Sequence, residues 1–391
     1  MKGYCKLKMN SVYKFALYCL SFFYFVIGSY NPNILGFNFS NFILFFVIAI
    51  IFLYSLDKIR ILNVSAVLIF AFYLFNFCLL NLVNIINCIS IYFKMIIPAI
   101  SMFIFFILLR KKQDVEFLYR TLLYTNIITC IIGIFNFYVL EDYGYTMMVD
   151  GLVTPRMRGS FLQPNVFSMY IILTLPFMVW ELHRTSNCYT SKKIQLLFYY
   201  GILLMNIFCL YMSKSRWSAI CLVIASVFMI FMDNNMQINR KILLYLATVL
   251  LFVIILIGVT EYSHLFYRNS DSLRLESILM AFGFISESIL WGNGIGSSFM
   301  AYNSLGYILD STYLNIAIES GLIGISLFLF INIMAFVSLM RKFKYKKELY
   351  PVLYMSIMII IGCCLENIFY NSLINSFFGL MWYNGFKVYT E

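Results

Sequence analysis

Long apolar runs alternate with short polar connections along almost the whole chain. A helix needs about 20 apolar residues to cross the hydrocarbon core of a bilayer. The runs are continuous and do not alternate with a period of two residues, which favours helices over a barrel. We therefore expect twelve membrane-spanning helices, near residues 13–28, 41–56, 61–81, 91–109, 121–140, 164–182, 194–212, 217–232, 242–260, 312–340, 350–366 and 372–386.

Composition supports this interpretation, because 62% of the 391 residues are hydrophobic and only 12% are charged. That balance excludes an ordinary soluble domain. The expected fold class is all-α, a polytopic integral membrane protein with one transmembrane domain over residues 1–391. The ten cysteines form no C-x-x-C pair and the two histidines fall in different loops, so we expect neither a metal site nor a cofactor.

The distribution of Lys and Arg predicts the orientation of the helices. Lys2, Lys6, Lys8 and Lys14 place the N-terminus in the cytoplasm, and every second connection after that is basic. This face then carries 21 of the 28 Lys and Arg residues, whereas the opposite connections 29–40 and 82–90 carry no charge. The net charge of +11 is thus a topology signal whose partner is anionic lipid, and it does not indicate nucleic acid binding.

Two connections on the outer face are longer than a link between helices requires, namely 141–163 and 261–311. Long structured loops between packed helices often serve as lids or binding surfaces. The second loop contains apolar residues at helical spacing, which predicts an amphipathic helix along the membrane surface. These residues are Leu275, Ile278, Leu279, Phe282, Ile285 and Ile289. Such a helix would hold Arg274 near the lipid headgroups.

Six cations on the outer face depart from the charge rule and need an explanation. They are Arg156, Arg158, Lys214, Arg216, Arg268 and Arg274, while Lys94 lies inside the fourth apolar run. Guanidinium groups match phosphate oxygens in pairs, so a phosphate-bearing substrate at the membrane surface would explain a cluster of arginines. Each arginine taken alone can equally be a solvated or lipid-facing charge. For Arg216, in its very short connection, we favour a functional role.

Acidic residues near the tenth apolar run provide candidates for proton transfer. Asp310 precedes this run, and a partly buried carboxylate there could deprotonate a sugar hydroxyl. Asp310 or Ser311 is equally suited to cap the helix that follows, and capping and catalysis can coexist. Glu319 lies deeper in the same run, where it either contacts the substrate or pairs with Lys94 or an arginine.

The segment "WGNGIGSSF", residues 291–299, is rich in glycine like a phosphate-binding loop. No strand and helix flank it in the order that a phosphate-binding loop requires, so we favour a turn that closes the amphipathic helix.

Four segments together resemble the bacterial O-antigen polymerase and O-antigen ligase superfamily. They are "RMRGSFLQPNVFSMYIILTLPF" (156–177), "SKSRWSAI" (213–220), "WGNGIGSSF" and "DSTYLNIAIESGLIG" (310–324), and the resemblance covers roughly residues 150–330. Ligases of this superfamily typically carry His where this chain has Asp310, followed after ten residues by Gly, and here Gly321 keeps that spacing. The change of side chain favours a polymerase.

The resemblance implies a GT-C-like glycosyltransferase in the bacterial inner membrane. It implies that a glycan leaves undecaprenyl diphosphate for a hydroxyl on the next lipid-linked repeat unit at the periplasmic face. Arg158, Arg216 and Arg274, with Arg156 and Lys214, would bind the diphosphate, and Asp310 would activate the acceptor. Tyr313 and Glu319 would contact the glycan. Membrane lipids and a chain-length regulator protein are the implied partners. The alternatives are an O-antigen ligase, a lipid-linked oligosaccharide flippase and a non-catalytic membrane subunit.

Overall fold

The structure is a computed structural model, and its described residues are 33–34, 37–38, 64–79, 85–109, 112–147, 153–161, 163–186, 193–232, 269–298, 311–367 and 372–387. This part of the chain is mostly helical, as expected. Three of the twelve predicted spans, 13–28, 41–56 and 242–260, lie outside the described residues.

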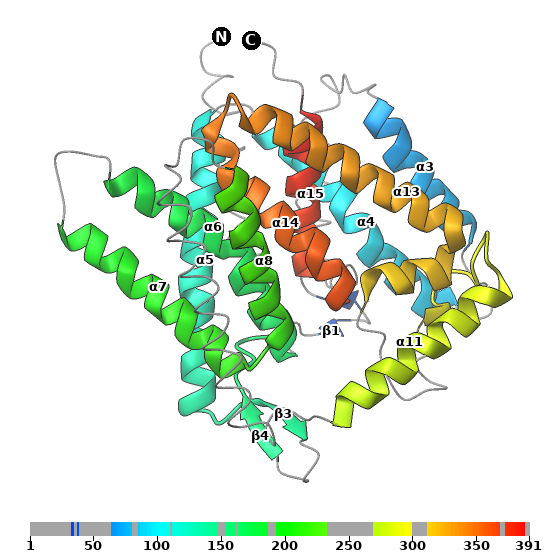
Figure 1. The fold of residues 1–391 in the computed structure, drawn as a ribbon, viewed down its shortest axis with the longest axis horizontal. Coiled ribbons are helices and arrows are strands. Elements are labelled where there is room, and N and C mark those ends of the chain that lie inside the picture. The colour runs from blue at the N-terminus through cyan, green and yellow to red at the C-terminus, as the bar shows by residue number, and fades with distance from the viewer. Residues whose placement is uncertain are drawn as a thin grey trace.

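Each of the other nine predicted spans coincides with a helix (Figure 1). The apolar runs thus locate the helices correctly, including the short last one. The nine helices are α3 (Val64–Cys78), α4 (Ile85–Leu108), α5 (Lys112–Tyr138), α6 (Pro164–Ser186), α7 (Lys193–Ser213), α8 (Arg216–Met232), α13 (Thr312–Phe343), α14 (Tyr350–Leu365) and α15 (Ser372–Phe386). The predicted amphipathic segment also forms a helix, α11 (Asn269–Glu287).

Two predicted loops contain short antiparallel strand pairs, which the expectation of an all-helical chain did not include. Strands β1 (Asn33–Ile34) and β2 (Phe37–Asn38) pair within residues 29–40. Strands β3 (Gly144–Met147) and β4 (Val153–Arg156) pair within residues 141–163, with Gly144 opposite Arg156. The second pair lies just below α8 in Figure 1, and the chain continues from β4 to α6.

Helix α5 begins about nine residues earlier than its predicted span. Residues 112–120 were expected to form a basic connection, but Leu118 and Tyr119 are buried and continue the helical spacing that leads to Leu122. The first residue, Lys112, forms an exposed ion pair with Glu348, in the 3-10 turn Lys347–Leu349 that precedes α14. The helix therefore extends beyond its most apolar section.

Helix α14 lies at the centre of the described bundle, between α6, α8, α13 and α15. Helices α4 and α15 pack closely against each other, because a Cβ placed at Gly379 would lie only 2.5 Å from the Cβ of Ser101 and 2.7 Å from the oxygen of Pro98. Small residues at a crossing let two helix backbones approach, and this is common where helices pack in lipid.

Two lysines join three helix ends at one end of the bundle, which we call the lysine end. The Lys342 ammonium donates to the carbonyl oxygens of Asn384 and Lys387, each at 2.8 Å, at the end of α15. The Lys387 ammonium donates to the Leu109 oxygen at 2.8 Å, just beyond α4. Cations at helix C-termini satisfy free carbonyl groups and complement the helix dipole.

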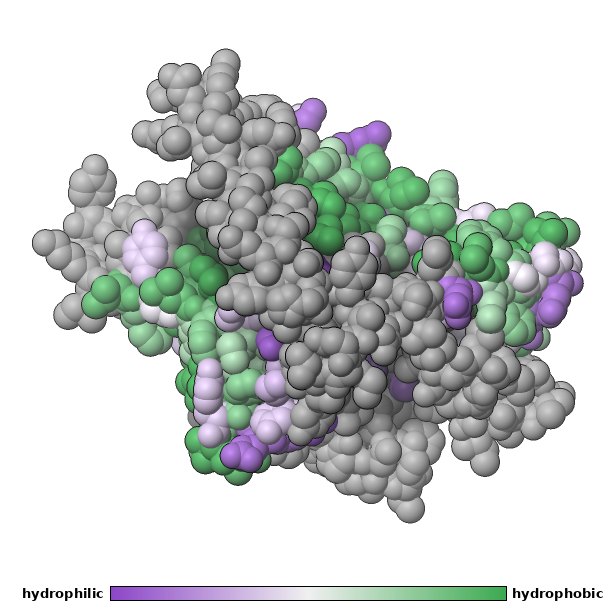
Figure 2. Space-filling view, turned by 60° about the horizontal axis from the view of Figure 1, so that its bottom comes forward, coloured by the Kyte–Doolittle hydropathy of each residue, from purple (hydrophilic) through white to green (hydrophobic). Residues whose placement is uncertain are grey.

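Apolar side chains cover much of the outside of the bundle. Helix α7 exposes Leu197, Tyr200, Leu204, Ile207 and Tyr211, which recur every three or four residues on one face. Within the described ranges, two helices are long and apolar enough to cross a membrane, α5 and α13. Figure 2 shows hydrophobic residues over both flanks and smaller hydrophilic patches between them. Large exposed apolar faces of this kind mark contact with lipid or another protein.

Candidate functional site

The end of the bundle opposite the lysine end carries strands β3 and β4, and we call it the hairpin end. Here β4 reaches the turn between α7 and α8, because the Met157 amide donates to the Met212 oxygen at 3.0 Å. The start of α13 meets the end of α14, because the Thr312 amide donates to the Glu366 oxygen at 3.3 Å. Segments distant in sequence therefore converge at this end, below α8 and α14 in Figure 1.

Arg156 is a buried cation that links three of these segments. Its Nε donates to the Ser213 oxygen at 2.8 Å, and one terminal nitrogen donates to Asn165 Oδ1 at 2.6 Å. The same nitrogen lies 3.5 Å from the Lys214 oxygen. These contacts tie the end of β4 to the α7–α8 turn and to the first turn of α6. Arg156 was predicted to bind substrate phosphate, but much of its guanidinium is committed to the protein, so we assign it a positioning role.

Asn165 connects Arg156 to a buried carboxylate, Glu366. Its amide nitrogen donates to Glu366 Oε1 at 2.9 Å, while its amide oxygen accepts from Arg156. Glu366 caps the C-terminus of α14, and its backbone oxygen accepts from the Thr312 hydroxyl at 3.0 Å. A cation and an anion are thus joined through one amide, at the point where α6, α13 and α14 meet. Such a chain fixes the orientation of every group in it.

Lys214 and Arg216 lie in the turn that Arg156 holds. Lys214 has a φ of 49°, a left-handed conformation that is uncommon for a residue with a side chain. Arg216 is the first residue of α8 and is half-buried. The turn is also held by a chain of hydroxyl groups, since Ser218 Oγ lies 3.0 Å from Ser215 Oγ and 2.7 Å from Ser168 Oγ on α6. Both cations therefore project from a firmly fixed backbone.

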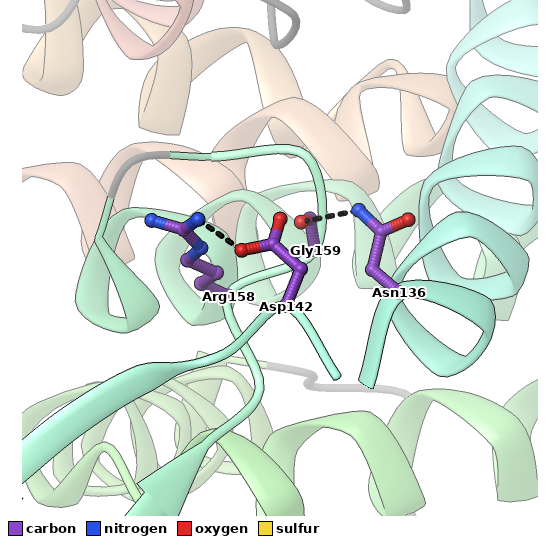
Figure 3. Close-up of polar contacts among 4 residues, drawn as sticks. All are labelled: Asn136, Asp142, Arg158 and Gly159. Atoms are coloured by element: carbon purple, nitrogen blue, oxygen red, sulfur yellow. Dashed lines mark hydrogen bonds and ion pairs between the residues drawn. The ribbon is translucent and has the colours of Figure 1, made fainter. Parts of the chain in front are cut away.

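Arg158 lies two residues beyond Arg156 but forms a separate contact. Its guanidinium pairs with Asp142, just after α5, as Figure 3 shows. In the same figure the Asn136 amide donates to the Gly159 oxygen at 3.0 Å. The Arg158 side chain keeps 29% of its surface exposed, and its Nε has no hydrogen-bond partner within the described ranges. One terminal nitrogen of Arg158 pairs with Asp142, and the guanidinium retains other donors for a ligand.

Two predicted site residues cannot be placed at the hairpin end. Asp310 lies outside the described residues, next to Ser311, whose hydroxyl accepts from the Leu314 amide as the N-cap of α13. The capping role that we left open between Asp310 and Ser311 thus belongs to Ser311. Arg274 lies in α11, where the backbone is described but the side chain is not.

Tyr313 was predicted to stack against a sugar ring. Its hydroxyl donates to the Ile360 oxygen at 3.2 Å, and its ring centroid lies 6.1 Å from that of Phe328. These contacts explain Tyr313 as a residue that packs α13 against α14. They give no support to the predicted contact with glycan.

Glu319 is fully buried, and its carboxylate binds the glycine-rich segment. Glu319 Oε1 accepts from the Gly296 amide at 3.2 Å and from the Ser298 hydroxyl at 2.5 Å. Residues 291–298 of this segment form irregular turns after α11, as we expected, and they are fastened to α13 by this carboxylate. These contacts favour a structural role for Glu319 over contact with glycan.

The same segment fills a break in α13 at Gly321. Gly321 has φ 61° and ψ −163°, so the carbonyl groups before it lose their helical partners. The Ile318 oxygen accepts instead from the Asn293 amide at 2.8 Å, and the Glu319 oxygen accepts from the Gly294 amide at 3.0 Å. A Cβ at Gly321 would lie 2.5 Å from the Gly292 nitrogen, so only glycine fits this crossing.

Helix α11 packs against this first part of α13 through a small contact. Ala281 is buried against Ile318, with Phe284 and Ile285 beside it. Most of the predicted apolar face points elsewhere, since Ile278, Leu279, Phe282 and Ile289 are exposed. The helix therefore presents apolar side chains outward, as a helix at a membrane surface does.

Sequence patterns did not identify Glu366 or Asn165 as candidate site residues. Glu366 directly follows an apolar run, in "CCLENIFYN", where an acidic residue commonly just ends a helix. Asn165 follows Gln163-Pro164, a typical helix start. Their position on the predicted outer face was the only feature of the sequence that could have marked them as site residues.

Neither the models of known protein families nor the curated protein sequences give a match to this chain.

Proposed function

We propose that this protein is a multi-pass membrane glycosyltransferase that joins lipid-diphosphate-linked glycan units at the outer face of the bacterial inner membrane. In this proposal it is a polymerase of O-antigen or of a related surface polysaccharide. The observation that carries the proposal is the chain from the α7–α8 turn through Arg156 and Asn165 to Glu366. It holds the cations of that turn and a carboxylate at one end of the bundle.

The arrangement of charge supports the orientation. The lysine end carries Lys342, Lys344, Lys346 and Lys387, and by the positive-inside rule it faces the cytoplasm. The hairpin end then faces outward. Arg216 begins α8 there, where the positive end of the helix dipole disfavours a cation. A bound anion would reverse that penalty, and a diphosphate is such an anion.

The roles follow from the chemistry of a lipid diphosphate leaving group. Arg216, with Arg158, Arg274 and Lys214, stabilises negative charge that builds on the diphosphate as the glycosidic bond breaks. Arg156 keeps the turn of Arg216 in place. Asp310 accepts the proton of the acceptor hydroxyl. Glu366 is the second carboxylate that could take this role. The leaving group is already activated, so the proposal invokes neither nucleotide nor metal.

One observation favours a second function, transport of a lipid-linked oligosaccharide. Transporters often carry helices broken near a buried charged residue, and α13 breaks at Gly321 beside Glu319. The carboxylate of Glu319 is already bound by Gly296 and Ser298, and the break is filled by backbone amides. We therefore favour the polymerase.

The phenotype of a gene deletion separates these functions. A polymerase mutant carries a single repeat unit on its lipopolysaccharide, a ligase mutant carries none, and a flippase mutant accumulates the lipid-linked unit inside the cell. We expect the single repeat unit, visible as loss of the ladder on a gel. A ladder of normal length from the deletion strain would refute the proposal.

A further inference from the structure

Lys94 is the one charged residue of α4, a helix that is otherwise almost entirely apolar. Its side chain is half-buried. Throughout the described ranges, no side chain or backbone oxygen forms an ion pair or a hydrogen bond with its ammonium group. The pairing of Lys94 with Glu319, one of the alternatives that we left open for Glu319, is therefore not formed. An unpaired charge inside an apolar helix is costly, and in membrane proteins it commonly marks a functional site.

The position of Lys94 on α4 directs it toward the protein. Pro98, Ser101 and Phe105 follow at spacings of four, three and four residues, so they share a helix face with Lys94. This face packs against α15, because Gly379 meets Pro98 and Ser101, and because the rings of Phe105 and Tyr383 lie 6.1 Å apart. A lysine that only extended toward lipid headgroups would lie on the opposite face.

Lys94 lies close to the depth of the hairpin-end cluster. Its backbone oxygen accepts from Asn375 on α15 at 2.7 Å. Two residues further along α15, the ring of Phe377 lies 6.1 Å from that of Tyr170 on α6. Tyr170 is about 7.5 Å along α6 from Asn165, and Asn375 is about 3 Å nearer the hairpin end than Phe377. The difference places the backbone of Lys94 about one helical turn further into the bundle than Asn165, toward the lysine end.

We propose that Lys94 binds a phosphate group of an isoprenoid diphosphate lipid. The inference rests on the proposed function and adds a residue from the N-terminal half of the chain to the diphosphate site. An ammonium group is a strong donor to phosphate oxygens, and an anion would supply a partner that the described residues do not. A phosphate attached to a lipid can also reach the depth of Lys94, which lies within the apolar part of its helix and not beyond the helix end.

The test measures binding of farnesyl diphosphate to the purified full-length protein in lipid nanodiscs, by the shift in thermal unfolding midpoint with ligand concentration. We expect Lys94→Met to weaken binding about tenfold or more, and Lys94→Arg to weaken it less than about threefold. Lys344→Met removes an exposed lysine at the lysine end and should leave binding unchanged. Equal binding by the wild type and Lys94→Met overturns the inference.

Two further ligands identify the source of the phosphate. Inorganic pyrophosphate lacks the isoprenoid chain, and phosphatidylglycerol offers a phosphate with a different lipid. We expect both to bind at least about tenfold more weakly than farnesyl diphosphate. Equal affinity for pyrophosphate would mean a site for a soluble anion, and equal affinity for phosphatidylglycerol would mean a headgroup site. Either result overturns the assignment to an isoprenoid diphosphate.

This binding assay needs no acceptor glycan, so its outcome is independent of the deletion phenotype. Binding that depends on Lys94, together with a normal ladder in the deletion strain, would reject the polymerase and keep the Lys94 site. Loss of the ladder together with unchanged binding by Lys94→Met would keep the polymerase and reject the Lys94 site. Replacing a charge that has no partner among the described residues by an apolar side chain should not impair folding, so Lys94→Met remains measurable.

Discussion

The two ends of the bundle use cations in different ways. At the lysine end, Lys342 and Lys387 bind free carbonyl groups at helix C-termini, where the helix dipole also favours a positive charge. Lys112 begins a helix at that end but pairs with Glu348. At the hairpin end, Arg216 begins α8, where the dipole opposes it. The cations of the lysine end serve stability, whereas Arg216 occupies a position that stability alone does not favour.

The two ends also differ in how their charges are connected. Lys342 and Lys387 contact backbone oxygens and the Tyr383 hydroxyl. Arg156 contacts the backbone of a turn and also, through Asn165, a buried carboxylate. A chain of that kind fixes side chains as well as helices. We infer that the hairpin end is built to hold charged groups in place, and each of the following variants tests this contrast.

The largest effect is expected from Arg216→Ala. Loss of a group that stabilises charge in the transition state lowers turnover about 100- to 1,000-fold, so the ladder should collapse to a single repeat unit. Arg216→Lys should restore it only in part, because the paired guanidinium donors are lost. Arg341→Ala, an exposed arginine near the lysine end, is the matched control and should leave the ladder unchanged. A full ladder from Arg216→Ala would remove the functional contrast between the two ends.

A comparison of two carboxylates sharpens the assignment of the proposed proton acceptor. Loss of a general base lowers turnover about 100-fold or more, so Asp310→Asn should be nearly inactive while remaining folded. Glu366→Gln keeps an oxygen that can accept from Asn165, so we expect a smaller loss, about tenfold. Rates of glycan extension in membranes measure both. If Glu366→Gln is inactive and Asp310→Asn is active, the two roles are exchanged.

Arg156→Met tests the positioning role. The change leaves the Ser213 oxygen and the Asn165 amide without their buried donor, so the free energy of unfolding should fall by about 3 kcal/mol. Thermal unfolding in detergent, with Arg341→Met as the control, measures this loss. Activity should fall as well, because the turn that carries Arg216 loosens. Unchanged stability would show that the hydrogen bonds of Arg156 do not hold the turn.

The smallest effect is expected at the lysine end. Lys387→Met removes a hydrogen bond to the Leu109 oxygen, and stability should fall by about 1 kcal/mol. The ladder should keep its length, because this contact lies at the end of the bundle away from the proposed chemistry. A short ladder at normal protein levels would contradict a purely structural role for this end.

The sequence was sufficient to locate the helices but not their contacts. Nine of the twelve predicted apolar runs coincide with described helices, and the charge rule placed Lys342 and Lys387 together at one end. The start of α5 was wrong, because the buried face through Leu118 and Tyr119 continues the helix into a basic segment. The helical spacing of buried residues marks the packed face of a helix, and that face can continue beyond the apolar run that predicts the helix.

The candidate site was less predictable, because its contacts join residues far apart in sequence. The role of Arg156 depends on Ser213, 57 residues away, and Asn165 lies 201 residues from Glu366. Glu319 appeared to need a cation, but its partners include a backbone amide and a hydroxyl in the glycine-rich segment. Side-chain chemistry identified which residues were unusual, and only the fold could identify their partners.

The decisive measurement is the extension of a purified lipid-linked repeat unit by the purified protein in liposomes. Wild-type protein should form a ladder of longer glycans in the presence of a metal chelator and without nucleotide, and Arg216→Ala should form none. A ladder of equal length from Arg216→Ala, or no ladder from folded wild-type protein, would refute the proposed role of Arg216 in glycan polymerisation.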